Sequence, residues 1–97
     1  MKLDFKKPCL DTEGEIIKEN NQSVLMSDLL RKALMTSQSN DETDIIKFFD
    51  WSLDLKKGVL DLDKADQKKL KDFITNEKNF FLMTKAQMFK VLEKPKA

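Results

Sequence analysis

Residues that usually carry out catalysis or bind metals are scarce in this chain. There is no histidine, and Cys9 is the single cysteine. Histidine is the commonest general base and neutral metal ligand, and structural zinc sites need several cysteine or histidine ligands. The sequence therefore excludes Ser-His-Asp and Cys-His catalytic arrangements. It predicts a protein that is not an enzyme, with no cofactor and no metal, and Cys9 is interpreted as a small packing residue.

Three closely spaced carboxylates come nearest to a metal-binding pattern. Asp61, Asp63 and Asp66 resemble the start of a calcium loop. A loop starting at Asp61 would need glycine at its sixth position, where Asp66 stands, and glutamate at its twelfth, where Asp72 stands. A helix cap at Asp63 explains the cluster better than a calcium ion does.

One apolar run is a candidate for contact with a protein partner. Residues 80–83 are the densest apolar stretch of the chain. Exposed aromatic and methionine side chains mark interfaces, so Phe80, Phe81 and Met83 are candidate partner anchors. The alternative is that this run fills the core between two helices, as such side chains usually do.

A lysine-rich C-terminal segment is a second candidate contact region. Residues 78–97 carry lysines against Glu93 alone as an acid. Lys85, Lys90 and Lys94 could contact phosphate or an acidic protein, or they could form a solvated helix face. The formal net charge of the whole chain is only +1, which disfavours a dedicated nucleic-acid binder.

The chain length and the scarcity of turn residues limit the fold that positions these groups. The 97 residues fit one domain, 1–97, and two Gly and two Pro are few for a sandwich or barrel. We expect a mainly α (α+β) fold, in which an N-terminal hairpin (1–22) precedes a helical body (23–94) and a short tail (95–97). No apolar stretch is long enough to span a membrane and no secretion signal is visible, so a cytoplasmic location is expected.

The N-terminal residues predict a hairpin. Leu3 and Phe5 alternate with charged residues, and the turn signal at 11–14 ends in Gly14. The expected strands are 2–11 and 15–19. The sequence leaves open whether they pair within the chain or extend the sheet of another molecule.

Four helices are expected after the hairpin. The first starts at Ser27 as its cap and ends before 36–40, and the second spans 41–57 with Gly58 after it. The buried stripe of the second should comprise Ile45, Phe48, Phe49, Ser52 and Leu53, widened by Ile46 and Trp51. The third runs from a cap at Asp63 to about Glu77. The fourth starts with a capping box of Thr84 and Gln87, carries Phe89 and Leu92 inward, and is stopped by Pro95.

The layout of the chain resembles that of small uncharacterised proteins of tailed bacteriophages and prophages. The resemblance rests on the opening at 2–8, the Leu-Asp-x-x-Gly turn at 10–14, the Leu-Leu-x-x-Ala-Leu helix at 29–34 and the segment at 60–66. It implies a bacterial host cytoplasm and a protein that acts in assembly or binds and inhibits a host factor. The sequence thus predicts a non-catalytic protein-protein interaction module or a self-associating one. The alternative is a nucleic-acid-associated regulator that uses the lysine-rich C-terminal helix.

Overall fold

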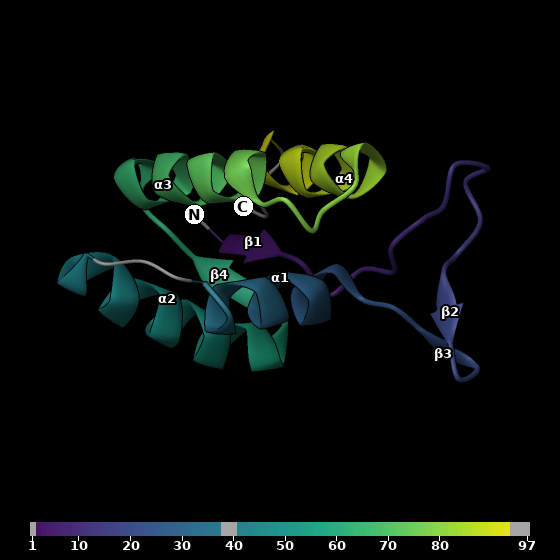
Figure 1. Ribbon diagram of the computed structural model, residues 1–97, viewed down its shortest axis with the longest axis horizontal. Coiled ribbons are helices and arrows are strands. Elements are labelled where there is room, and N and C mark those ends of the chain that lie inside the picture. Colours follow the sequence, from purple (N-terminus) through teal and green to yellow (C-terminus); the bar gives the residue numbers. More distant parts are fainter. Residues whose placement is uncertain (1, 38–40, 94–97) are drawn as a thin grey trace.

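Two short strands that are far apart in the sequence form the centre of the fold (Figure 1). In this computed structural model, which describes residues 2–37 and 41–93, β1 (Lys2–Asp4) pairs antiparallel with β4 (Val59–Asp61). Leu3 lies opposite Leu60, and both side chains are fully buried. The N–H of Phe5 donates to the carbonyl of Gly58, which continues the pairing beyond the strands.

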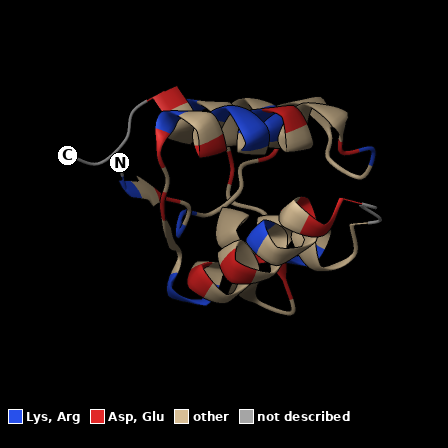
Figure 2. Ribbon diagram, turned by 90° about the vertical axis from the view of Figure 1, so that its left-hand side faces the viewer, with Lys and Arg blue, Asp and Glu red and all other residues tan. Residues whose placement is uncertain are grey.

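Helices cover this strand pair from two sides. Figure 1 shows α3 and α4 above the strands and α1 and α2 below them. In Figure 2, basic and acidic residues are interspersed on both layers, so neither presents a surface of one charge sign on that side. The helices are α1 (Met26–Met35), α2 (Glu42–Asp54) with the 3₁₀ turn η1 (Leu55–Lys57), α3 (Lys64–Asn76) and α4 (Leu82–Glu93). The expected class is confirmed: a mainly α domain with a small N-terminal hairpin and, within the described residues, four helices.

The hairpin forms around the expected turn, but its strands differ from the expected ones. Asp11 accepts hydrogen bonds from the N–H groups of Glu13 and Glu15, and Leu10 pairs with Ile16. Residues 2–4 pair with β4 instead of facing 15–19. The physical reason is burial, because the pairing with β4 places Leu3 and Leu60 in the core, whereas a two-stranded hairpin buries little.

The chain between the hairpin turn and α1 folds back on itself once more. Strands β2 (Lys18–Glu19) and β3 (Gln22–Ser23) pair across Asn20 and Asn21, which both have positive φ, 52° and 64°. Asparagine tolerates this conformation better than most residues, and two positive φ angles suit a tight two-residue turn. Residues 8–25, called the N-terminal arm below, project beside the helical layers (Figure 1).

One of the three predicted helix caps, Asp63, is confirmed, and Asp41, which the sequence placed in the first turn of its helix, is a further cap. Asp41 accepts hydrogen bonds from the N–H groups of Thr43 and Asp44 at the start of α2. Asp63 accepts from the N–H of Asp66 at the start of α3, which ends at Asn76. Both caps are local interactions within one helical turn, so they follow from residue type and spacing alone.

The other two predicted caps are wrong. Helix α1 has Leu25 at its N-cap, and Ser27 lies inside the helix and is buried. The N–H groups of Met26 and Ser27 donate instead to the carbonyls of Lys7 and Phe5, so backbone from the N-terminal segment replaces a side-chain cap. Helix α4 starts at Leu82, and Thr84 is buried within its first turn.

The buried face of α2 also differs from the predicted stripe. Phe48, Trp51 and Ser52 are buried as expected, and Leu55 joins them. The four other apolar side chains of the expected stripe are exposed: Ile45, Ile46, Phe49 and Leu53. Apolar residues surround most of this helix, so periodicity alone does not distinguish the side that packs against α1.

Helix α3 buries the side that its sequence predicts, whereas α4 does so only in part. Leu70 and Ile74 are fully buried in α3, and Phe73 packs against the core. In α4 the buried residues are Thr84, Met88 and Val91, while Phe89 and Leu92, which were expected to point inward, are only partly buried against the core. Pro95 and the expected tail lie outside the described residues.

Candidate interaction surfaces

The predicted anchors near the start of α4 have different environments. Phe80 is partly buried and packs against the core, which agrees with the expectation that this run fills the core between two helices. Phe81 is 82% exposed and Met83 is 38% exposed. Leu82, which the sequence did not single out, is 83% exposed. The first turn of α4 therefore presents apolar side chains to solvent, whereas Phe80 belongs to the core.

The N-terminal arm lies against this end of α4. The side chain of Gln87 accepts a hydrogen bond from the N–H of Leu10 at 2.8 Å and donates to its carbonyl at 2.9 Å. It also donates to the carbonyl of Met83 at 3.1 Å. Since Leu10 and Ile16 are partners in an antiparallel bridge, their side chains lie on the same side of the arm. Gln87 therefore connects the exposed apolar residues of the arm with those of α4.

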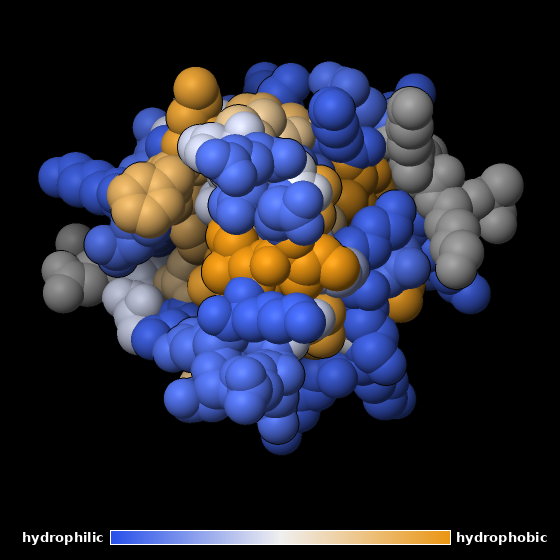
Figure 3. Space-filling model, turned by 90° about the vertical axis from the view of Figure 1, so that its right-hand side faces the viewer, coloured by the Kyte–Doolittle hydropathy of each residue, from blue (hydrophilic) through white to orange (hydrophobic). Residues whose placement is uncertain are grey.

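These residues form one candidate surface, called the arm–α4 surface here. Figure 3 shows that face of the molecule, with hydrophobic side chains gathered at its centre and hydrophilic ones around them. Monomeric proteins seldom expose a large contiguous apolar patch without a function for it. The exposed apolar residues of the surface are Leu10, Ile16, Phe81, Leu82 and Met83.

A second exposed apolar surface lies on the outer side of α2. We call Ile45, Ile46, Phe49 and Leu53, together with Met35 at the end of α1, the α2 face; each of the five is at least 44% exposed. A groove of about 260 Å³ runs beside it, between the end of α1 and the first half of α2. The sequence identified four of these residues as apolar but assigned them to the core, so it missed this surface.

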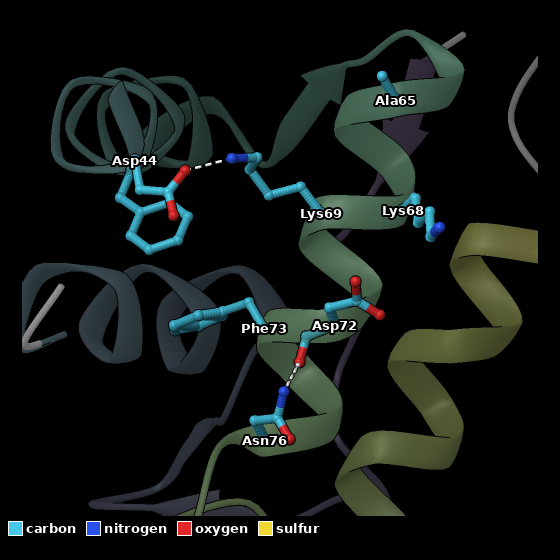
Figure 4. Close-up of a pocket in the computed structure, with 8 residues that line it drawn as sticks. Asp44, Ala65, Lys68, Lys69, Asp72, Phe73 and Asn76 are labelled. Atoms are coloured by element: carbon cyan, nitrogen blue, oxygen red, sulfur yellow. Dashed lines mark hydrogen bonds and ion pairs between the residues drawn. The ribbon is translucent and has the colours of Figure 1, made fainter. Parts of the chain in front are cut away.

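A third depression, between α2 and α3, is crossed by ion pairs (Figure 4). Asp44 of α2 binds the Nζ of Lys69 of α3, and Lys47 binds Asp66. The hydrogen bond to Asp44 raises the pKa of Lys69 above its usual value. Phe73 lies beside Phe48 with ring centroids 5.1 Å apart, next to these pairs. The charged groups here join the two helical layers to one another, which is a structural role.

The predicted phosphate-contacting lysines do not converge on one described site. Lys85 donates to the carbonyl of Thr75 at 2.8 Å, which ties α4 to the end of α3. Lys90 is exposed, and Lys94 lies outside the described residues. Lys71 of α3 lies over the ring of Phe89, with 5.8 Å between Nζ and the ring centroid, so that ring is already covered by a cation.

The single cysteine and the acidic side chains of the described residues do not form a reactive or metal-binding site. Cys9 is buried, and burial, followed by the charge of Asp28, raises the pKa of its thiol. A raised pKa lowers the thiolate fraction and with it the reactivity of a cysteine. Across residues 2–37 and 41–93, no three acidic or cysteine side chains are grouped in a way that could hold a metal ion.

Comparisons with known proteins give no match: no family model, no curated protein and no solved structure is similar to the chain. None of the helices in the described part of the chain is both long and apolar enough to span a membrane.

Proposed function

We propose that this protein is a small non-catalytic protein-protein interaction module that binds its partner through the arm–α4 surface. The observation that carries the proposal is the exposure of two consecutive large side chains, Phe81 at 82% and Leu82 at 83%. Water contact with such side chains is unfavourable, and burying each in a partner is worth roughly 1.5–3 kcal/mol. Aromatic side chains of this kind commonly carry most of the energy of an interface.

The arrangement of the surface supports a preformed site. Leu82 and Met83 belong to a helix whose other side is anchored in the core by Met88 and Val91. The arm is joined to the same helix by the two hydrogen bonds between Gln87 and Leu10. Little ordering of the backbone would be needed on binding, which lowers the entropic cost of association. The matching partner is a protein with an apolar pocket that accepts an aromatic ring and a neighbouring leucine.

The biological setting of the proposal follows from the resemblance of the sequence layout to small phage and prophage proteins. In that setting the module acts in virion assembly or binds and inhibits a host factor in a bacterial cytoplasm. The nucleic-acid alternative has less support, because Lys85 already donates to the backbone of α3. Acidic residues are also interspersed with the basic ones on both helical layers (Figure 2).

Site-specific photo-crosslinking in the cells that naturally produce the protein tests the proposal. A photoreactive phenylalanine analogue at Leu82 should capture one protein in a discrete band, and the additional change Phe81→Asp should abolish that band. The same analogue at Lys64, an exposed residue at the start of α3, is the matched control and should capture nothing discrete. Equal crosslinking from both positions, or capture of nucleic acid, would contradict the assignment.

A further inference from the structure

The outer side of α2 and the η1 turn that follows it has the same order of charged, aliphatic and aromatic residues in both directions, except that its two terminal charges have opposite signs. Five residues of this segment are separated by three, four, four and three positions, and this spacing places their side chains on one side of the helical segment. The three apolar members are exposed, and so are the two charged ones. In order along the segment, they are Glu42, Ile45, Phe49, Leu53 and Lys56.

Such a stripe is complementary to an antiparallel copy of itself. If Phe49 lies against Phe49 of a second molecule, Ile45 faces Leu53 in both halves of the contact. Glu42 then faces Lys56 at both ends, so two equivalent opposite-charge pairs flank an apolar centre. A parallel alignment would instead bring Glu42 against Glu42 and Lys56 against Lys56. The antiparallel alignment also opposes the two helix dipoles favourably.

The neighbouring groove adds to this complementarity. Met35 is 63% exposed beside Ile45 and Phe49, and the three residues line the groove of about 260 Å³. An enclosed cavity of roughly 150 Å³ is enough to hold benzene, so the groove has room for one aromatic ring of a second molecule. Each copy offers both a ring, Phe49, and a groove, as a two-fold symmetric contact requires.

We propose that the α2 face is the interface of a symmetric homodimer in which two copies of α2 pack antiparallel about Phe49. The proposal concerns a different surface from the arm–α4 surface, and it stands whether or not that surface binds a partner. The contact is about one helix wide, which places it among small interfaces that dissociate on dilution. Because dimerisation leaves the arm–α4 surface exposed, the dimer presents two copies of that surface.

Sedimentation equilibrium over a range of concentrations tests the dimer and its centre. The unmodified chain should show a reversible monomer–dimer equilibrium. Phe49→Asp places two carboxylates at the axis and should weaken the dimer roughly 30-fold or more, the loss typical of a central hot spot. Leu82→Asp, on the arm–α4 surface, is the matched control and should leave the equilibrium unchanged. Both positions are exposed, and circular dichroism verifies that the variants remain folded.

Charge exchange tests the antiparallel alignment. Glu42→Lys and Lys56→Glu should each weaken self-association, by about tenfold for two reversed surface pairs. The double variant restores both pairs and should recover the original dissociation constant. An equimolar mixture of the two single variants should form a heterodimer, since each chain then carries one sign at both ends.

A monomer at all concentrations, or a dimer that tolerates Phe49→Asp, would overturn the proposal. Single charge variants that do not recover on mixing would overturn the antiparallel alignment. Neither result bears on photo-crosslinking from Leu82, so a failure of the dimer and a failure of the proposed partner surface are distinguishable.

Discussion

Of the two glycines, Gly58 has the stricter steric requirement. It has φ of +86° between η1 and β4, and a Cβ at this position would lie 2.6 Å from the Cβ of Lys6. We expect Gly58→Ala to destabilise the fold by more than the roughly 1–2 kcal/mol that left-handed backbone costs an L-residue, because the clash adds to that cost. Urea unfolding followed by fluorescence of the single tryptophan, Trp51, measures the change.

Gly14 provides the control for this prediction. Its φ of +81° is nearly the same, but no atom lies within 4 Å of the position its Cβ would occupy. Gly14→Ala should therefore show the backbone cost alone. Equal losses for the two variants would mean that the approach of Lys6 to Gly58 is unimportant for stability.

The candidate surface was only partly predictable at the residue scale. Phe81 and Met83 were identified by type, but Leu82 was not distinguished from its neighbours. The reason is the position of the helix start: the capping pattern at Thr84 predicts a helix that begins three residues too late. With α4 starting at Leu82, Phe80 turns toward the core while Phe81 and Leu82 remain exposed. Which member of an apolar run faces water depends on where its helix starts.

At the scale of elements, the side chain of Gln87 joins the N-terminal arm to α4. Gln87→Ala removes both hydrogen bonds to the backbone of Leu10. At a net value of about 0.5–1.5 kcal/mol per bond, we expect the amide of Leu10 to exchange with solvent roughly tenfold faster. Hydrogen exchange observed by NMR measures this effect for the single amide.

A second glutamine gives the matched control for the arm. Gln67 also donates from its side chain to a backbone carbonyl, that of Leu62, but far from the arm. Gln67→Ala should leave the exchange of the Leu10 amide unchanged. If both variants accelerated it equally, the effect would be one of global stability and not of the contact between Gln87 and Leu10.

The elements also show which parts of the fold the sequence could predict. The cap at Asp63 was predicted because a carboxylate reaches amides of its own helical turn, and the cap at Asp41 forms for the same reason although the sequence pattern placed that residue inside the helix. The start of α1 was not predicted, because its first amides donate to carbonyls from the N-terminal segment. The buried side of α2 was misassigned because Ile45, Phe49 and Leu53 have the same helical spacing that a buried stripe would have. Which side of α2 is buried depends on its contacts with α1, and the sequence of α2 alone does not contain that information.

At the scale of the whole molecule, β1 and β4 connect the two helical layers. The pairing of Leu3 with Leu60 joins segments that are far apart in the sequence, so no local sequence pattern predicts this pairing. Ion pairs between α2 and α3 connect the same layers at a second place. The layers should therefore unfold together, as small single domains usually do.

Leu60→Ala tests this cooperativity. The side chain is fully buried, so its truncation should cost roughly 2–5 kcal/mol. Because Trp51 reports on the α1–α2 layer and far-ultraviolet circular dichroism reports on all helices, the two thermal transitions should shift downward together. Val59→Ala, on the same strand but 36% exposed, should shift both much less. A tryptophan transition that moves while a large helical signal persists would mean that α3 and α4 form a stable unit without the strand pair. The central strands would then be an attachment between two independent layers and not the shared core that their burial indicates.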